Sequence, residues 1–304
     1  MGAGHGHGAP VAGHAGGAHR WRLRAAFVLV ACYFVVELVA GLVSGSLALV
    51  SDAGHMAADV VALGAALVAT RIASRPDTTG RRTFGSYRAE VFASGLAVLL
   101  MLGVAVFIVV EAVGRIGGSP EVASGTMLVV GGLGLVVNVV ALVLLRGGAG
   151  ESLNVKGAYL EVVADTVGSV GVVVAGLLVS ATGNALWDTV IALAIAVFVA
   201  LRAVMLGREV LSVLAQHAPR GIRPDEAESA LRGVPDVVDV HDLHLWTLTS
   251  GMHVATAHLV CRAGADPATV LAAAAGVLRE RYAIDHATLQ VEPSGSRSCA
   301  ETSW

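Results

Sequence analysis

Long apolar stretches separated by short polar segments dominate the first part of the chain. A helix that crosses a lipid bilayer needs about 20 mainly apolar residues. Six stretches meet this requirement, and they run from Arg24 to Gly45, Leu47 to Ile72, Glu90 to Ile116, Ser124 to Leu145, Lys156 to Ala181 and Trp187 to Leu206. The pattern therefore predicts an all-α domain of six transmembrane helices, which we place at residues 22–216.

The pattern changes after this region, where short apolar runs alternate with polar turns. Pro224 and Gly233 bracket a short helical segment, because proline favours the first turn of a helix and glycine often follows its end. Strand patterns follow at Val237–Leu248, Met252–Cys261 and Ala287–Glu292, with a helical segment at Pro267–Tyr282. The order αββαβ predicts a small cytoplasmic α+β domain with a ferredoxin-like arrangement at residues 217–293.

Composition agrees with a membrane protein. The chain is 55% hydrophobic and 14% charged, whereas soluble domains are about 25% charged. The net charge of -3 is small and indicates no nucleic-acid partner. Three scattered cysteines exclude a disulfide framework or a CxxC zinc site. Residues 1–21 form a His/Gly-rich tail without the apolar region of a signal peptide, and we expect a flexible tail at 294–304.

Arginine and lysine are unevenly distributed over the predicted loops. Cytoplasmic loops collect these residues. They gather before the first stretch, between the second and third, between the fourth and fifth, and after the sixth, where Arg202 and Arg208 stand. The opposite side shows only Arg115. We therefore expect an integral protein of a bacterial plasma membrane, surrounded by lipid, with six spans and both termini in the cytoplasm.

Two pairs of ionisable residues lie four positions apart inside the predicted spans. His55 and Asp59 share one face of the second span, and Glu161 and Asp165 share one face of the fifth. A single polar residue could serve only helix packing, but ionisable groups within a membrane usually face an ion, a partner or a water-filled path. Two such pairs could supply the four ligands of a tetrahedral divalent metal.

Three further polar residues lie in or near the spans. Asp52 could line an exit path, although its preferred interpretation is a carboxylate that interacts with the positive end of its helix. Glu37 and Asn138 are interpreted as polar groups that join packed helices.

Several collinear motifs resemble the cation diffusion facilitator family of zinc transporters, over about Arg22–Glu292. They are SLALVSDAGHMAAD (Ser46–Asp59), FGSYRAEV (Phe84–Val91), EAVGRIGGSPEV (Glu111–Val122), LNVKGAYLEVVADTVGSVG (Leu153–Gly171), VHDLHLWTLTSG (Val240–Gly251) and IDHATLQVE (Ile284–Glu292). The resemblance implies a homodimeric secondary transporter, not an enzyme, that exchanges cytoplasmic Zn2+ or a related divalent ion for external protons. It implies no cofactor, because the metal is the substrate and a regulatory ligand.

The resemblance also implies a transport site between the second and fifth spans. His55, Asp59 and Asp165 match its ligands, whereas Glu161 stands where a histidine is most familiar. One histidine and three ionised carboxylates leave a bound Zn2+ site with a formal charge of -1. Either one carboxylate stays protonated or the site favours harder ions. We therefore expect weaker discrimination for zinc and a steeper dependence on pH.

Histidines outside the spans form two groups. By resemblance, His241, His258 and His286 lie on strands where family members bind regulatory metal; the alternative is that backbone and water satisfy them. Four more stand in the amino-terminal tail, at positions His5, His7, His14 and His19. These four either collect metal weakly or are incidental in a disordered leader.

Three alternatives remain beside zinc efflux. The main substrate could be another divalent ion, such as Cd2+, Co2+ or Mn2+. The chain could be a membrane-anchored metal sensor, although that leaves four ionisable groups in two spans unexplained. An intramembrane metalloenzyme would need HExxH or an equivalent ligand set, and the sequence contains no HExxH.

Overall fold

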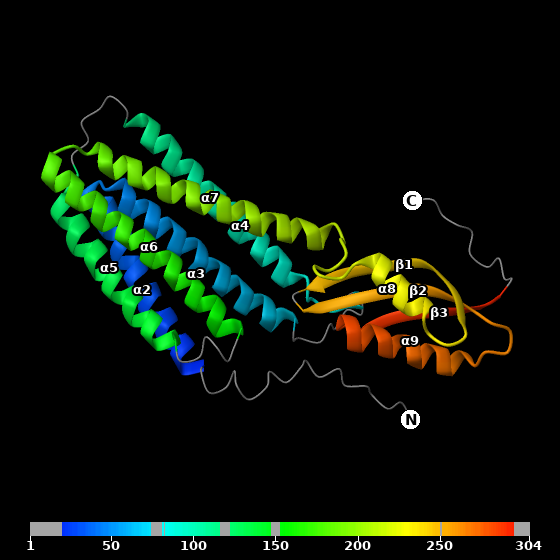
Figure 1. The fold of residues 1–304 in the computed structure, drawn as a ribbon. Helices are drawn as coiled ribbons and strands as arrows, with labels where there is room; N and C mark the ends of the chain where they lie inside the picture. The colour runs from blue at the N-terminus through cyan, green and yellow to red at the C-terminus, as the bar shows by residue number, and fades with distance from the viewer. Residues whose placement is uncertain are drawn as a thin grey trace. The chain divides into compact units, whose positions relative to one another are not determined.

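The computed structural model describes residues 20–73, 81, 83–115, 122–146, 153–249 and 251–294. Within this part, the long helices are α2 (Arg20–Ser44), α3 (Leu47–Ala73), α4 (Ala89–Gly114), α5 (Ser124–Arg146), α6 (Leu153–Thr182) and α7 (Leu186–Leu214) (Figure 1). The later elements are α8 (Pro224–Arg232), β1 (Val237–Thr249), β2 (Met252–Cys261), α9 (Pro267–Tyr282) and β3 (His286–Pro293). The amino-terminal histidines and the tail after Ser294 lie outside the described residues.

The chain divides into two units. The first comprises Met1–Gly64 and Leu96–Val204, and the second comprises Ala65–Gly95 and Met205–Trp304. The first unit therefore holds α2, α5, α6 and the larger parts of α3, α4 and α7. The second unit holds the carboxyl end of α3, the amino end of α4 and the carboxyl end of α7. It also holds a three-stranded β-sheet and two short helices, α8 and α9.

Five helices of the described part are long and apolar enough to cross a membrane. They lie within α2, α4, α5, α6 and α7. The predicted span at Leu47–Ile72 coincides with α3, which has 27 residues and carries Asp52, His55 and Asp59. A helical transmembrane domain is therefore confirmed, whereas the sixth span stays a prediction.

Large apolar side chains cover the outer surface of the first unit. Val43, Val129 and Leu99 expose 83%, 73% and 67% of their surface. A soluble protein rarely exposes so much contiguous apolar surface, and lipid is the solvent that such a surface suits.

Small residues let the helices of this unit approach closely. Helix α5 contacts both α2 and α6. Gly134 of α5 faces the hydroxyl of Tyr33, and a Cβ atom at Gly131 would lie only 2.9 Å from Cγ1 of Val172. The absent side chains allow these contacts, as in other packed membrane helices.

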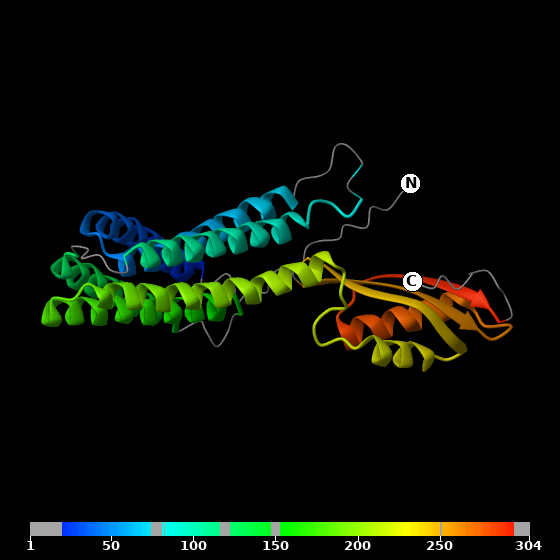
Figure 2. The same ribbon diagram turned by 90° about the horizontal axis from the view of Figure 1, so that it is seen from above.

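The second unit contains a three-stranded mixed sheet with the order β1-β2-β3. Strand β1 is antiparallel to β2, and β2 is parallel to β3. Helix α8 contacts β1, α9 contacts β3, and the two helices contact each other along one side of the sheet (Figure 2). Ala227, Leu231, Leu259, Val270 and Leu278 contribute to the core between these layers. The predicted αββαβ order is therefore present.

Candidate transport site

The start of α3 is held by a carboxylate from α7. Asp188 is fully buried, and its oxygens accept hydrogen bonds from the backbone N–H of Leu47 at 2.7 Å and of Ala48 at 3.0 Å. The hydroxyl of Ser46 donates to the same carboxylate at 2.6 Å. Arg115 lies 3.4 Å from Asp188 and balances its charge. These contacts satisfy N–H groups that a helix start leaves without intrahelical partners, and they fix the helix that carries His55 and Asp59.

Three of the predicted ligands meet between α3 and α6. Nε2 of His55 lies 3.6 Å from Oδ2 of Asp59 and 3.5 Å from Oδ1 of Asp165. One ligand atom from each residue lies within 4.8 Å of the other two. Ligand atoms of a tetrahedral zinc ion lie roughly 3.3 Å apart, given bonds of about 2.0 Å. The three side chains therefore need little movement to hold a divalent ion.

Two side chains of this cluster are almost fully buried, and some of their polar atoms have no partner. His55 and Asp165 expose 2% and 5% of their surface. Among the described residues, Oδ1 of Asp165 and Nδ1 of His55 are buried without a hydrogen-bond partner. A buried polar atom without a partner costs about 1–3 kcal/mol. The unpartnered Oδ1 of Asp165, which faces Nε2 of His55, therefore favours a bound cation or proton over an empty site.

The fourth predicted residue, Glu161, is not part of this cluster. Its carboxylate instead accepts a hydrogen bond from Nη2 of Arg202 on α7, at 2.5 Å. Nη1 of the same guanidinium lies 2.9 Å from Nε2 of His55. The distribution of cationic residues predicts that Arg202 lies at the cytoplasmic end of the sixth span, whereas the structure places it inside α7. Its position within an apolar stretch was the sequence signal that could have identified it.

The remaining polar residues of the first unit have distinct surroundings. Nδ2 of Asn138 donates to Oγ of Ser169 at 3.1 Å, which joins α5 to α6. The fully buried Glu37 accepts a hydrogen bond from Tyr33, one turn away on α2, at 3.0 Å.

Asp52 is the sixth residue of α3 and lies beyond its first turn. Interaction with the helix dipole falls off within that turn, so the helix-start interpretation of Asp52 does not hold.

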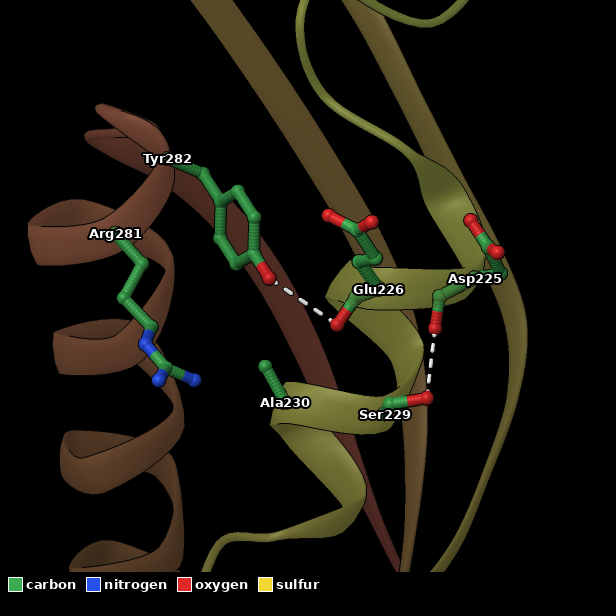
Figure 3. A pocket seen from close by; sticks show the side chains of 6 residues that line it. All are labelled: Asp225, Glu226, Ser229, Ala230, Arg281 and Tyr282. Atoms are coloured by element: carbon green, nitrogen blue, oxygen red, sulfur yellow. Dashed lines mark hydrogen bonds between the residues drawn. The ribbon is translucent and has the colours of Figure 1, made fainter.

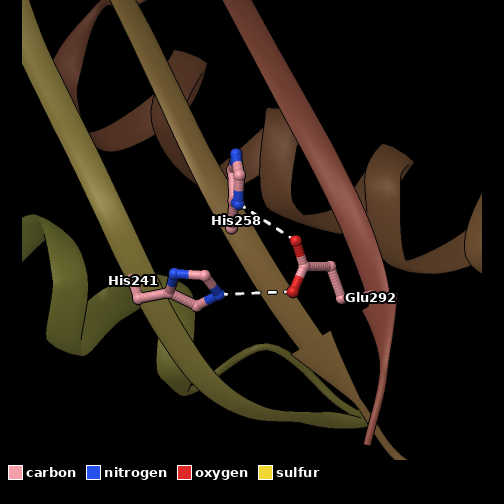
Figure 4. A group of neighbouring side chains, drawn as sticks. All are labelled: His241, His258 and Glu292. Carbon is pink, nitrogen blue, oxygen red and sulfur yellow. Dashed lines mark hydrogen bonds and ion pairs between the residues drawn. The ribbon is translucent and has the colours of Figure 1, made fainter. Parts of the chain in front are cut away.

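A second cluster lies on the sheet of the second unit (Figure 4). His241 of β1 pairs in register with His258 of β2. Oε1 of Glu292 on β3 lies 3.0 Å from Nδ1 of His258, and Oε2 lies 3.4 Å from Nε2 of His241. A ligand atom from each of the three lies within 4.8 Å of the other two. Two imidazoles and a carboxylate on three strands could therefore share one metal ion.

His286 lies apart from this cluster. It pairs with Val254 across β2 and β3, whereas His258 pairs with Gln290. Its ring contacts Phe84, with ring centroids 5.6 Å apart. The structure thus brings two of the three predicted histidines together with Glu292, through the parallel register of β2 and β3.

Among the other described residues of the sheet, no second group of three ligands converges, although Asp242 lies 3.0 Å from Nε2 of His244 and 3.9 Å from Nε2 of His258. Burial lowers the pKa of His253, whose ring lies 3.2 Å from the hydroxyl of Thr247. Burial likewise raises the pKa of the Cys261 thiol, which lies in the core. The raised pKa disfavours the thiolate form that metal binding requires.

An open hollow of about 700 Å³ lies between α8 and α9 (Figure 3). One hydrogen bond ties the two helices together, because the hydroxyl of Tyr282 on α9 donates to the carbonyl of Glu226 on α8 at 3.1 Å. The hydroxyl of Ser229 donates to the carbonyl of Asp225 at 2.8 Å within α8. Among its lining side chains, no group of three metal-binding residues converges.

Two family models match the chain. The cation efflux transmembrane domain matches residues 23–215, and the cytoplasmic domain of cation efflux proteins matches residues 219–294. The chain therefore belongs to the cation efflux family, with a helical transmembrane domain followed by a cytoplasmic domain that contains a small mixed sheet.

Curated relatives match nearly end to end. The metal cation efflux system protein CzcD of Cupriavidus metallidurans is 41% identical, over 96% of this chain and 90% of its own. The cadmium, cobalt and zinc/H(+)-K(+) antiporter of Bacillus subtilis is 31% identical, over 92% and 91%. The zinc transporter ZitB of Escherichia coli is 34% identical, over 89% and 87%.

Proposed function

We propose that this chain is a secondary transporter, not an enzyme, which exports a divalent metal cation in exchange for protons. The observation that carries the proposal is the convergence of His55, Asp59 and Asp165 inside the membrane domain of a cation efflux protein. Relatives are named for zinc, cobalt and cadmium. Among these ions, Zn2+ is the substrate best suited to a site of one imidazole and carboxylate oxygens.

The proposed transport site contains His55, Asp59, Asp165 and Glu161. The first three supply ligand atoms, and Glu161 contributes its charge at the edge of the cluster. Metal and protons compete for these groups, because a ligand must lose its proton before it binds metal. Rocking of helices around the site would expose it to each side of the membrane in turn, as in other secondary transporters.

The proposed topology has six spans in a bacterial plasma membrane, with both termini in the cytoplasm. The transport domain occupies residues 22–216 and a ferredoxin-like cytoplasmic domain occupies 217–293, between tails at 1–21 and 294–304. The match to the cytoplasmic-domain family supports a homodimer formed through this domain. Within it, His241 and His258 would bind regulatory zinc together with Glu292, whereas His286, four register pairs from His258, would not share that ion.

Growth of a bacterium that lacks its own zinc exporters tests the proposal. Wild-type protein should restore growth on excess zinc, and Asp165→Asn should not, although the two side chains have the same shape. Asp225→Asn is the matched control, because Asp225 is exposed in α8. Restoration by Asp165→Asn would exclude this site, and restoration by no variant would favour a membrane-anchored metal sensor.

A further inference from the structure

Arg202 is a fixed positive charge within an apolar membrane helix. Its side chain on α7 is only 20% exposed. A cation at such a place is costly unless it has a partner. Its two hydrogen-bond partners belong to the proposed transport site: Glu161 at 2.5 Å and His55 at 2.9 Å. Arg202 therefore acts on the same groups that a metal would use.

The contact with His55 defines the protonation of the ring. A guanidinium can only donate hydrogen bonds, and it does not lose its proton in proteins. Nε2 of His55 must therefore accept, which makes the ring neutral with its proton on Nδ1. This same Nε2 faces Asp59 and Asp165. The lone pair available for a metal is thus occupied by Arg202.

Phe198 offers the guanidinium a third contact. It lies one turn before Arg202 on α7, with the guanidinium carbon over its ring, 5.9 Å from the centroid. The same ring meets His55 edge-on, with centroids 6.2 Å apart. Aromatic faces attract cations, so the guanidinium could release His55 and still be stabilised by Phe198 and Glu161.

The formal charges are consistent with this competition. Asp59, Glu161 and Asp165 carry three negative charges when ionised, and Arg202 carries one positive charge. The site with Arg202 is therefore doubly negative, and a divalent ion makes it neutral. Without Arg202, the same bound site would keep one negative charge.

We propose that Arg202 is a tethered cation that holds the empty transport site and competes with the metal for His55, with Glu161 as its anchor. The inference rests on the proposed transport function of the site. An incoming divalent ion displaces the guanidinium from Nε2 of His55 by electrostatic repulsion, while the ion pair with Glu161 persists. When the guanidinium returns to His55, it weakens metal binding and promotes release. Arg202 thus sets the affinity of the site without being a ligand.

Zinc flux in proteoliposomes tests this role with four variants. Arg202→Met removes the competitor, and we expect KM to fall by about tenfold while kcat also falls, because the more negative site releases metal slowly. Glu161→Gln removes the anchor and one negative charge, and KM should rise by about tenfold. The double variant has the formal charge of wild type, and its KM should return to within about threefold of the wild-type value. Arg208→Met is the matched control on the same helix, and its KM and kcat should equal those of wild type.

KM should fall in Arg202→Met and rise in Glu161→Gln, and these opposite changes distinguish the proposed role of Arg202 from a purely structural one. A purely structural Arg202 would lower kcat in Arg202→Met without lowering KM, and that result would overturn the inference. A double variant whose KM deviates as far as that of either single variant would also overturn it. If Arg202→Met does not fold, Arg202→Lys takes its place: it keeps the charge but loses the two-pronged contact, so its KM should fall, and an unchanged KM would contradict the proposal. Failure of wild type to transport zinc, or flux by Asp165→Asn equal to wild type, would instead refute the proposed function.

Discussion

The carboxylate of Asp188 on α7 accepts a hydrogen bond from the backbone N–H of Leu47 at the start of α3, with an O···N distance of 2.7 Å. The two residues are 141 positions apart in the sequence. The contact places the first turn of α3, and through it His55 two turns later, relative to α7. One buried carboxylate thus links the geometry of the candidate site to the packing of two helices.

Replacement of Asp188 should destabilise the protein. Asp188→Ala removes the acceptor of several helix-start donors and leaves Arg115 without its buried partner. We expect the free energy of unfolding to fall by about 2–4 kcal/mol, because the variant loses a helix cap and a buried ion pair. Thermal unfolding in detergent measures the effect, and Asp225→Ala serves as the exposed control. A transition temperature equal to that of wild type would contradict this role of Asp188.

The metal profile should depend jointly on Glu161 and Arg202. Glu161→His alone gives two imidazoles and two carboxylates but leaves the Arg202 charge without its partner, so zinc affinity should fall by about tenfold. Glu161→His with Arg202→Met restores a neutral zinc-bound site and should favour Zn2+ over Mn2+ more strongly than wild type does. Flux of Zn2+, Cd2+, Co2+ and Mn2+ into vesicles measures the profile. Identical profiles in wild type and double variant would refute this explanation of selectivity.

Zinc binding to the transport site should weaken as the pH falls. Protonation of a ligand excludes the metal from it, so each proton released on binding should change the apparent Kd by about tenfold per pH unit. The affinity for zinc should therefore rise with pH until every ligand is deprotonated. An acidic exterior should promote the release of zinc. Titration calorimetry in buffers of different ionisation enthalpy measures the number of protons. A pH-independent Kd would contradict proton exchange at this site.

The cytoplasmic cluster should bind metal through Glu292 and not through His286. In an Asp165→Asn background, which weakens the transport site, Glu292→Gln should lower the zinc bound per chain. His286→Ala should leave that stoichiometry unchanged, because His286 lies four register pairs away from His258. Equilibrium dialysis of the full chain provides the measurement. If His286→Ala lowers binding as much as Glu292→Gln does, the ligand set derived from the sheet register is wrong.

Local patterns were sufficient to predict much of the fold. Apolar length predicted the long helices, and the second unit has the expected αββαβ order, with β1 and β2 within a residue of the predicted bounds. The pair His55 and Asp59 follows from helical spacing alone, since four positions always return to one face. These features depend on neighbours in the sequence, which is why sequence reasoning found them.

Contacts between distant elements could not be predicted in the same way. Arg202 meets Glu161 and His55 only because α7 packs beside α3 and α6, whereas its charge in the sequence indicates only the orientation in the membrane. Glu292 joins His241 and His258 through a parallel register that no local pattern fixes. Asp188 caps a helix far from it in the chain. In each case the tertiary packing, rather than the local sequence, decides the partner.

The most direct test of the account is zinc flux into proteoliposomes that carry an imposed proton gradient, compared between wild type and Asp165→Asn. We predict gradient-driven zinc transport by wild type, with proton movement in the opposite direction. Asp165→Asn should lose at least about tenfold in flux at equal protein content, because it removes a buried ligand charge without changing the shape of the site. Equal flux in the two proteins, or wild-type zinc flux without proton movement, would contradict the central claim.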